Sequence, residues 1–96
     1  MSERLSVHIR RARESDTADM LEVTRQIWEG HDYVPLEWPA WLADSEGALL
    51  VAEYNGRVIA LGKLSRLADE DWWMQGMRVH PDFEGHGVAS QITEGL

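Results

Sequence analysis

Two apolar segments near the middle of the 96-residue chain give its clearest structural signal. Residues 48–54 (ALLVAEY) and 57–65 (RVIALGKLS) are separated by Asn55-Gly56. Asn-Gly is the preferred pair for a two-residue β-hairpin turn, because both turn positions adopt positive φ. Runs rich in Val, Ile and Leu on either side of such a pair are typical of strands. The pattern predicts a β-hairpin over residues 48–65.

One strand is predicted before this hairpin and another after it. Residues 5–12 place their apolar side chains on one face of a first strand. Residues 72–79 form a further, mostly apolar strand, which an acidic connection at 67–71 joins to the hairpin. We therefore expect a three-stranded meander that follows a separate N-terminal strand.

Two helices are predicted between the first strand and the hairpin. Apolar residues recur at helical spacing over 16–29, and Ser15-Asp16 provides an N-cap for this helix. Residues 37–42 can form a short second helix with Pro39 in its first turn, where the missing N–H of proline needs no partner. The predicted order is β-α-α-β-β-β-loop-α.

Composition and charge exclude several classes of function. The chain has 9 basic and 17 acidic residues, a net charge of −8, which argues against a general nucleic-acid binder. It has no cysteine, so disulfides and thiolate metal sites are excluded. The N-terminal segment lacks the apolar core of a signal peptide, and no apolar run approaches the ~20 residues of a membrane span. We expect no nucleic-acid partner, no membrane association and a cytoplasmic location.

The segment most typical of a binding site covers residues 75–90. A mostly apolar strand leads into a turn at Pro81 and then into a loop with Gly85 and Gly87, and the loop opens a helix. This order brings backbone N–H groups and the positive end of a helix dipole to one place, which suits a phosphate or pyrophosphate. An ordinary strand–helix turn is the alternative interpretation of the two glycines.

This segment resembles the acetyl-CoA-binding motif of the GNAT superfamily of N-acetyltransferases. The match consists of residues 77–81 (MRVHP) at the strand end, followed by Gly87 and Ala89. The resemblance implies an α/β (α+β) GNAT-like fold, with a mostly antiparallel sheet and flanking helices, of which residues 1–96 form the N-terminal portion. It also implies an acyltransferase that uses acetyl-CoA as co-substrate and transfers the acetyl group to a primary amine of a small molecule or amino acid.

The resemblance also assigns roles to particular residues. Met77 and Val79 would offer backbone groups to the acetyl and pantetheine carbonyls, and residues 84–89 would surround the pyrophosphate with backbone N–H groups. The cofactor-binding residues implied in this way are Met77, Arg78, Val79, Glu84, Gly85, His86, Gly87, Val88, Ala89 and Ser90. Glu84 departs from the family pattern, which has Arg or Gln at that position, and its carboxylate would repel a pyrophosphate.

A narrower resemblance covers residues 27–96 and points to the GNAT subgroup that includes histidine N-acetyltransferases. It places Asp32, Tyr33 and Trp41 near the pocket for the acceptor amine. Gln75 is the candidate catalytic residue, because related strands often carry at that position a glutamate that can act as a general base. Glutamine cannot take a proton, so Gln75 would orient a water molecule or the substrate.

Several residues have simpler interpretations that stay open at this point. His80 and His86 are typical of surface turns, and no third ligand has the spacing of a metal site, so we expect no metal. Arg10, Arg11 and Arg13 are expected to form a solvated basic end, and the tryptophan pairs to serve in packing. The alternative function is a non-catalytic acyl-CoA-binding module, or a fragment that self-assembles through exposed apolar surface, and a homodimer is left open.

Overall fold

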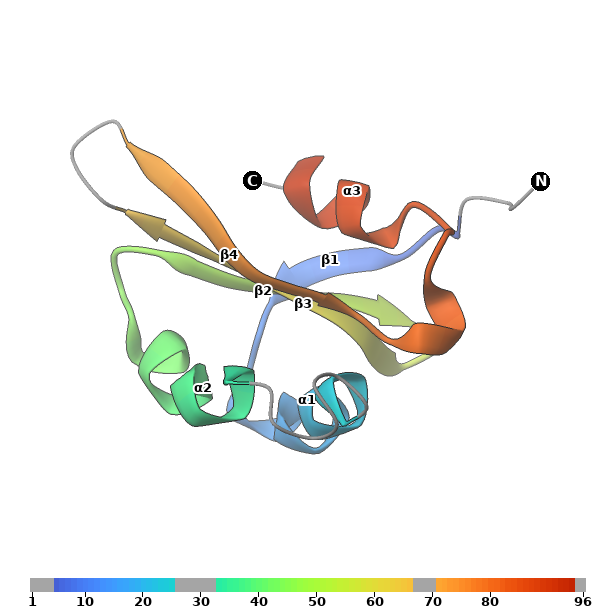
Figure 1. Cartoon of the computed structure of the whole chain (residues 1–96), viewed down its shortest axis with the longest axis horizontal. Coiled ribbons are helices and arrows are strands. Elements are labelled where there is room, and N and C mark those ends of the chain that lie inside the picture. Colours follow the sequence, from blue (N-terminus) through green and yellow to red (C-terminus); the bar gives the residue numbers. More distant parts are fainter. Residues whose placement is uncertain (1–4, 26–32, 67–70, 95–96) are drawn as a thin grey trace.

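The computed structural model describes residues 5–25, 33–66 and 71–94, which form one sheet with helices on both of its faces (Figure 1). The elements are, in chain order, β1 (His8–Arg11), the 3-10 helix η1 (Glu14–Asp16), α1 (Thr17–Thr24), α2 (Val34–Ala43), β2 (Ala48–Tyr54), β3 (Arg57–Arg66), β4 (Trp72–Val79), the 3-10 helix η3 (Pro81–Phe83) and α3 (Val88–Glu94). The expected order of strands and helices is therefore confirmed. None of the helices in the described residues combines the length and the apolar composition of a membrane-spanning segment.

The four strands form an antiparallel sheet in the order β1-β2-β3-β4. The turn between β2 and β3 consists of Asn55 at φ +52° and Gly56 at φ +79°, the positive values that a two-residue hairpin turn requires. The hairpin predicted from Asn-Gly is confirmed. Strands that follow one another in the chain are thus neighbours in the sheet, and the two α-helices are inserted between β1 and β2.

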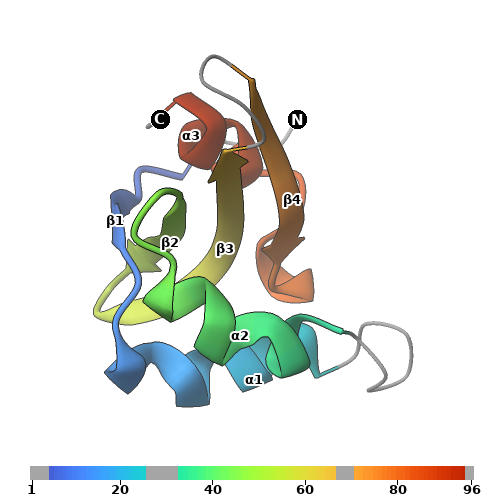
Figure 2. The ribbon, with the colours of Figure 1, turned by 90° about the vertical axis from the view of Figure 1, so that its left-hand side faces the viewer.

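Apolar side chains from both faces of the sheet build two cores. Helices α1 and α2 cover one face, and α3 covers the other (Figures 1 and 2). The core under α1 and α2 contains Met20, Val23, Val34, Trp38, Trp41, Leu49, Val51, Val58 and Leu61. The core under α3 contains Leu50, Ala52, Ile59, Ala60, Val88 and Ile92. The central strands β2 and β3 are consequently apolar on both faces, as their sequences indicate.

Helix boundaries differ from the prediction in the second helix. Helix α2 begins at Val34, because Pro35 occupies its first turn, where a proline leaves no intrahelical hydrogen bond unmade. Pro39 then falls inside the helix, so its expected place in the first turn is wrong. The first helix ends at Thr24, and residues 26–29 of its predicted range lie outside the described part of the chain.

Arg10 belongs to a partly buried ion-pair network and not to a solvated basic end. Its guanidinium donates to both carboxylate oxygens of Asp16 at 2.9 Å and to Glu53 on β2 at 3.0 Å. The Asp16 carboxylate also accepts the backbone N–H of Arg13 at 2.7 Å. Asp16 stands at the N-cap position of α1, but its side chain makes no cap hydrogen bond to that helix. It joins β1 to the helical layer instead.

Candidate functional site

A β-bulge interrupts the pairing of β3 with β4 at Gly76. After the Leu61–Arg78 pair, the two strands return to register at Lys63 and Gln75, with one residue of β3 opposite two of β4. Gly76 has φ +65°, the left-handed conformation that a glycine adopts in one common type of bulge. A bulge leaves its extra residue unpaired in the ladder, so the backbone here can bind a group other than β3.

The bulge changes which side chains of β4 share a face. In a regular strand, residues 74 and 77 would point to opposite faces. Here Met74 and Met77 both pack against the core under α3. Arg78 lies on the other face, with its guanidinium 5.4 Å from the ring centre of Tyr33, the residue before α2. One strand therefore presents apolar side chains to α3 and polar ones to α2.

A groove runs between β4 and α3. Its lining residues are Met74, Met77, Ala89, Ser90 and Thr93. Gly62 of β3 lies beneath it, and a Cβ atom there would stand 3.1 Å from Met77 Cε and 3.2 Å from Met74 Sδ. The glycine thus lets both methionine side chains lie flat against the sheet. The result is an open, mostly apolar groove with the hydroxyl groups of Ser90 and Thr93 on its helical side.

The loop from β4 to α3 carries the two predicted glycines in special conformations. Gly85 has φ +82° and Gly87 has φ +74°, values that residues with a Cβ atom rarely adopt. The carbonyl of His86 accepts the backbone N–H of Leu5 at 3.0 Å. Helix α3 begins directly after Gly87, and the first N–H groups of a helix have no partner within it. The start of α3 lies beside the groove, whose wall includes Ala89 and Ser90.

The Gln91 side chain fastens this loop to the beginning of the chain. Its amide group donates to the carbonyl of Leu5, and to that of Gly87 at 3.3 Å. Its carbonyl oxygen accepts the backbone N–H of Val7 at 3.4 Å. Leu5, Val7 and Ile9, which the sequence placed on one face of the first strand, all pack against the core under α3. Gln91 was not among the predicted residues, because a glutamine on a helix carries no signal of its distant partners.

An aromatic surface lies on the other face of β4. The rings of Tyr33 and Trp41 meet edge to face, with centres 6.1 Å apart. The Trp41 ring covers Gly76, since a Cβ atom at that glycine would stand 2.5 Å from Trp41 Cη2. The guanidinium of Arg78 lies over Tyr33 and donates to the carbonyl of Met77 at 2.9 Å. The predicted acceptor residues Tyr33 and Trp41 therefore lie together beside the bulge.

A chain of polar groups also reaches β4 at Gln75, directly before the bulge. Lys63, which is 1% exposed, donates from Nζ to Asp44 Oδ2 at 2.6 Å, to the carbonyl of Leu64 at 3.1 Å and to Ser65 Oγ at 3.1 Å. Ser65 Oγ also accepts from Gln75 Nε2 at 2.8 Å. The hydrogen bond from Lys63 lowers the pKa of Asp44, with further donation from the backbone of Glu46.

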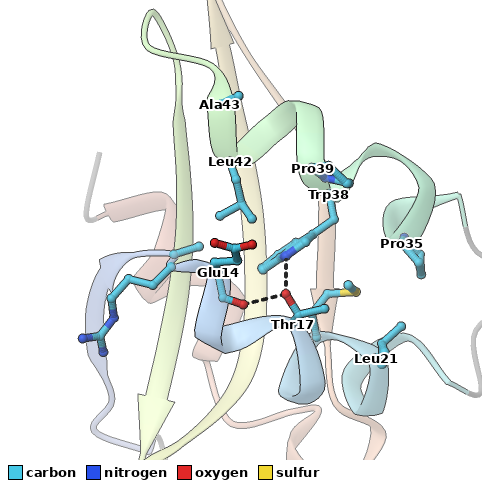
Figure 3. Close-up of a pocket in the computed structure, with 11 residues that line it drawn as sticks. Glu14, Thr17, Leu21, Pro35, Trp38, Pro39, Leu42 and Ala43 are labelled. Atoms are coloured by element: carbon cyan, nitrogen blue, oxygen red, sulfur yellow. Dashed lines mark hydrogen bonds between the residues drawn. The ribbon is translucent and has the colours of Figure 1, made fainter.

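A separate pocket lies between α1 and α2 (Figure 3). Its walls include the side chains of Leu21, Trp38 and Leu42, with Glu14 at one side (Figure 3). Trp38 Nε1 donates to Thr17 Oγ1 at 3.1 Å, and Thr17 Oγ1 donates to the carbonyl of Glu14 at 2.6 Å. These bonds fix the two helices relative to each other and explain why a buried indole nitrogen is tolerated there.

Comparison with known proteins decides the family. Residues 11–96 match the model of the "Acetyltransferase (GNAT) family". The chain belongs to the GNAT acetyltransferase family. It is also 34% identical over 82 residues to a histidine N-acetyltransferase of Oreochromis niloticus, a match that covers 84% of this chain and 24% of that protein. The chain thus spans about a quarter of the length of the curated relatives it matches.

Solved GNAT structures share this fold. An N-acetyltransferase of Thermoplasma acidophilum, solved with coenzyme A, superposes with a TM-score of 0.77 at 14% identity, over 95% of this chain and 69% of that one. A GNAT acetyltransferase of Brucella melitensis, solved with acetyl-CoA, superposes with a TM-score of 0.74 at 22% identity, over 95% and 66%. The predicted α/β GNAT-like fold and the resemblance to histidine N-acetyltransferases are both confirmed.

The structure separates the predicted GNAT site residues into two groups. The side chain of Met77, together with Ala89 and Ser90, lines the groove under α3. The side chain of Arg78 lies on the opposite face, beside Tyr33. The remaining predicted cofactor residues form the end of β4, the glycine loop and the start of α3: Val79, Glu84, Gly85, His86, Gly87 and Val88. Asp32 lies outside the described residues.

The histidines and the buried lysine complete the comparison with the sequence. The Nδ1 atom of His80 accepts the backbone N–H of Asp82 at 3.1 Å, so this histidine caps η3. Among the residues that the structure describes, no three His, Asp or Glu side chains gather closely enough to hold a metal ion. Lys63 was missed by the sequence reasoning. Its signal is a cation in the interior of the apolar strand RVIALGKLS, where burial requires a specific partner.

Proposed function

We propose that this chain forms the acetyl-CoA-binding part of an N-acetyltransferase that transfers the acetyl group to a primary amine of a small molecule or amino acid. The family membership supports the transferase class. The solved relatives that hold acetyl-CoA or coenzyme A support the co-substrate. The similarity to histidine N-acetyltransferases favours an amino acid as the acceptor.

The observation that carries the proposal is the bulge at Gly76. The bulge lies between the apolar groove under α3 on one face of β4 and the aromatic surface formed by Tyr33 and Trp41 on the other. In the proposed complex, the pantetheine arm lies along the groove and the acceptor amine approaches from the aromatic surface. The thioester then stands at the bulge, where the backbone at Met77 is outside the regular ladder.

The proposed chemistry is direct attack of a neutral amine on the thioester carbonyl. A C–N bond forms, the C–S bond breaks, and the electron pair and one proton end on the sulfur of coenzyme A. A backbone N–H at the bulge polarises the carbonyl, which is the role of fixed donors in other acyl-transfer sites. Holding the two substrates together supplies much of the remaining acceleration, because it makes the reaction effectively unimolecular.

The glycine loop is the proposed pyrophosphate site. Gly85 and Gly87 allow the backbone to approach a ligand closely and to direct N–H groups toward it. The net charge of −8 opposes any anion, so binding must come from these local dipoles. Glu84 is exposed, and its side chain can turn toward water while its backbone stays in the loop.

Titration with acetyl-CoA tests the proposal. We expect the backbone amide NMR signals of residues 84–89 and of Met77 to shift, and incubation with L-histidine or another amino acid to yield an acetylated product by mass spectrometry. Signals in the α1–α2 pocket, such as the Trp38 indole N–H, serve as the internal control. Unchanged loop signals at saturating acetyl-CoA would contradict the proposal.

A non-catalytic acyl-CoA-binding module is the second candidate. Gln75 favours it, because a carboxamide cannot act as a general base, and Glu84 stands where the family pattern has Arg or Gln. In this case acetyl-CoA would shift the same loop signals, but no amine in a panel of amino acids would be acetylated. Product formation by mass spectrometry therefore separates the two candidates.

Self-association of the chain is the remaining proposal about partners. Trp72 and Trp73 on β4 are 50% and 52% exposed, and β4 is an edge of the described sheet. Large exposed aromatic side chains on an edge strand favour pairing with a second copy. Light scattering coupled to size-exclusion chromatography measures the molar mass, and a monodisperse monomer would contradict self-assembly.

A further inference from the structure

Lys63 is the most deeply buried charged residue of the described structure, and its ammonium group has a complete set of acceptors. The residue is 1% exposed. Its three N–H bonds go to Asp44 Oδ2 at 2.6 Å, the carbonyl of Leu64 at 3.1 Å and Ser65 Oγ at 3.1 Å. An ammonium group has three donors and no acceptor, so its bonding capacity is fully used. Three hydrogen bonds in different directions therefore fix the position of Nζ.

This ammonium group acts on Gln75 through Ser65. A hydroxyl oxygen accepts two hydrogen bonds, and Ser65 Oγ receives one from Lys63 and one from Gln75 Nε2 at 2.8 Å. Lys63 and Gln75 are also direct partners across the β3–β4 ladder. Because the amide nitrogen of Gln75 is bound to Ser65, the amide oxygen of Gln75 points away from the Ser65 hydroxyl.

The held amide lies beside the bulge. Gln75 is the residue directly before Gly76, and the Trp41 ring covers that glycine. The aromatic surface formed by Tyr33 and Trp41 and the polar chain that starts at Asp44 therefore reach adjacent residues of β4. An ion pair of this kind is not by itself a source of stability, because the Lys63 ammonium has to leave water to form it. A role in holding Gln75 gives this ion pair a function.

We propose that Lys63 and Ser65 are positioning residues, which hold the Gln75 carboxamide so that its oxygen accepts a hydrogen bond from the acceptor amine. The proposal rests on the N-acetyltransferase function proposed above. The bond uses one N–H of a neutral primary amine and leaves the nitrogen lone pair directed at the thioester carbonyl carbon. Gln75 takes no proton, and the proton that the amine loses ends on the departing sulfur.

Side-chain NMR tests the positioning without any substrate. In the 96-residue chain, the Nε2 protons of Gln75 are expected to exchange with water slowly. Ser65→Ala should speed this exchange about tenfold, the effect of one ordinary hydrogen bond. Lys63→Met, which keeps the unbranched side chain but removes the ammonium group, should do the same. Ser65→Thr should restore slow exchange, and Ser6→Ala at an exposed position is the matched control. Unchanged exchange in Ser65→Ala would overturn the positioning role.

Steady-state kinetics with acetyl-CoA and L-histidine test the role in transfer. Ser65→Ala and Gln75→Ala should each lower kcat about tenfold with an unchanged KM for acetyl-CoA, and the double variant should lose no more than either single one. Full kcat in Ser65→Ala, or losses that multiply in the double variant, would overturn the role. A wild-type chain that acetylates no amine would end the proposed function and this role together. The exchange rates would still decide whether Lys63 and Ser65 hold the amide.

Discussion

The indole ring of Trp41 lies directly against the backbone of Gly76. A Cβ atom at Gly76 would stand 2.5 Å from Trp41 Cη2 and 2.9 Å from Cζ3, well inside van der Waals contact. Glycine is required here for two reasons at once, the left-handed φ of +65° and the ring above it. The bulge and the aromatic surface of the acceptor side are therefore parts of one structure.

Replacing this glycine should destabilise the fold strongly. Gly76→Ala adds backbone strain and forces Trp41 to move, so we expect a loss of about 2–4 kcal/mol in the free energy of unfolding. Gly56→Ala is the matched control, since its φ is +79° but no heavy atom lies within 4 Å of the added Cβ. That variant should lose about 1–2 kcal/mol from strain alone. Equal losses of unfolding free energy in the two variants, measured by urea unfolding, would show that the Trp41 ring does not oppose the added methyl group.

The two partners of the buried ion pair should respond unequally to substitution. Asp44→Asn leaves the Lys63 ammonium inside the protein without a counter-charge, which is costly. Lys63→Met removes the buried charge and leaves Asp44, which is 34% exposed, in contact with water. We expect Asp44→Asn to lower the urea midpoint more than Lys63→Met does. The opposite ranking would mean that water or another group reaches Lys63.

Acid should weaken the junction between β1 and the helical layer. The hydrogen bond from Arg10 lowers the pKa of Asp16 below its ordinary value of 3.8, with a further contribution from the Arg13 backbone. A depressed pKa in the folded state stabilises the protein above 3.8, and this stabilisation is lost as pH falls through the folded value. The midpoint temperature of thermal unfolding should therefore decrease less between pH 5 and pH 2 in Asp16→Asn than in the wild type. Asp71→Asn, at an exposed position, controls for the loss of one charge.

Charge reversal at Glu84 should strengthen coenzyme A binding. Glu84→Arg replaces a repulsive charge beside the proposed pyrophosphate with an attractive one, and we expect about tenfold tighter binding by calorimetry at low salt. Glu46→Arg changes the net charge equally at an exposed turn before β2. Similar gains in both variants would mean that only the overall field matters and that the loop is not the site.

Sequence patterns that depend on near neighbours predicted most of the fold. Asn55-Gly56 indicated the hairpin because a two-residue turn needs positive φ at both positions. The glycines at 85 and 87 indicated the loop for the same physical reason. The second helix was placed too late, since Pro35 and Pro39 both suit a first turn and local sequence does not choose between them.

The parts of the site that escaped prediction depend on contacts between distant residues. Lys63 and Asp44 are 19 positions apart, and their pairing follows from the way α2 ends above β3. The bulge at Gly76 follows from register, which is set by packing on both faces of the sheet. Arg78 was assigned to the cofactor by its place in the motif, but the bulge turns its side chain toward Tyr33. Single-sequence reasoning has no access to such parity changes.

The bonds from Gln91 to Leu5 and Val7 also set an order of events during synthesis. They join residues 86 and 84 positions apart, whereas β2 and β3 meet across two residues. Closing a long loop costs more chain entropy than closing a short one, so local pairs form first. The hairpin can fold while the chain is still leaving the ribosome. The glycine loop takes its final shape after residue 91 has emerged, and until then the face of the sheet that α3 covers stays exposed to solvent.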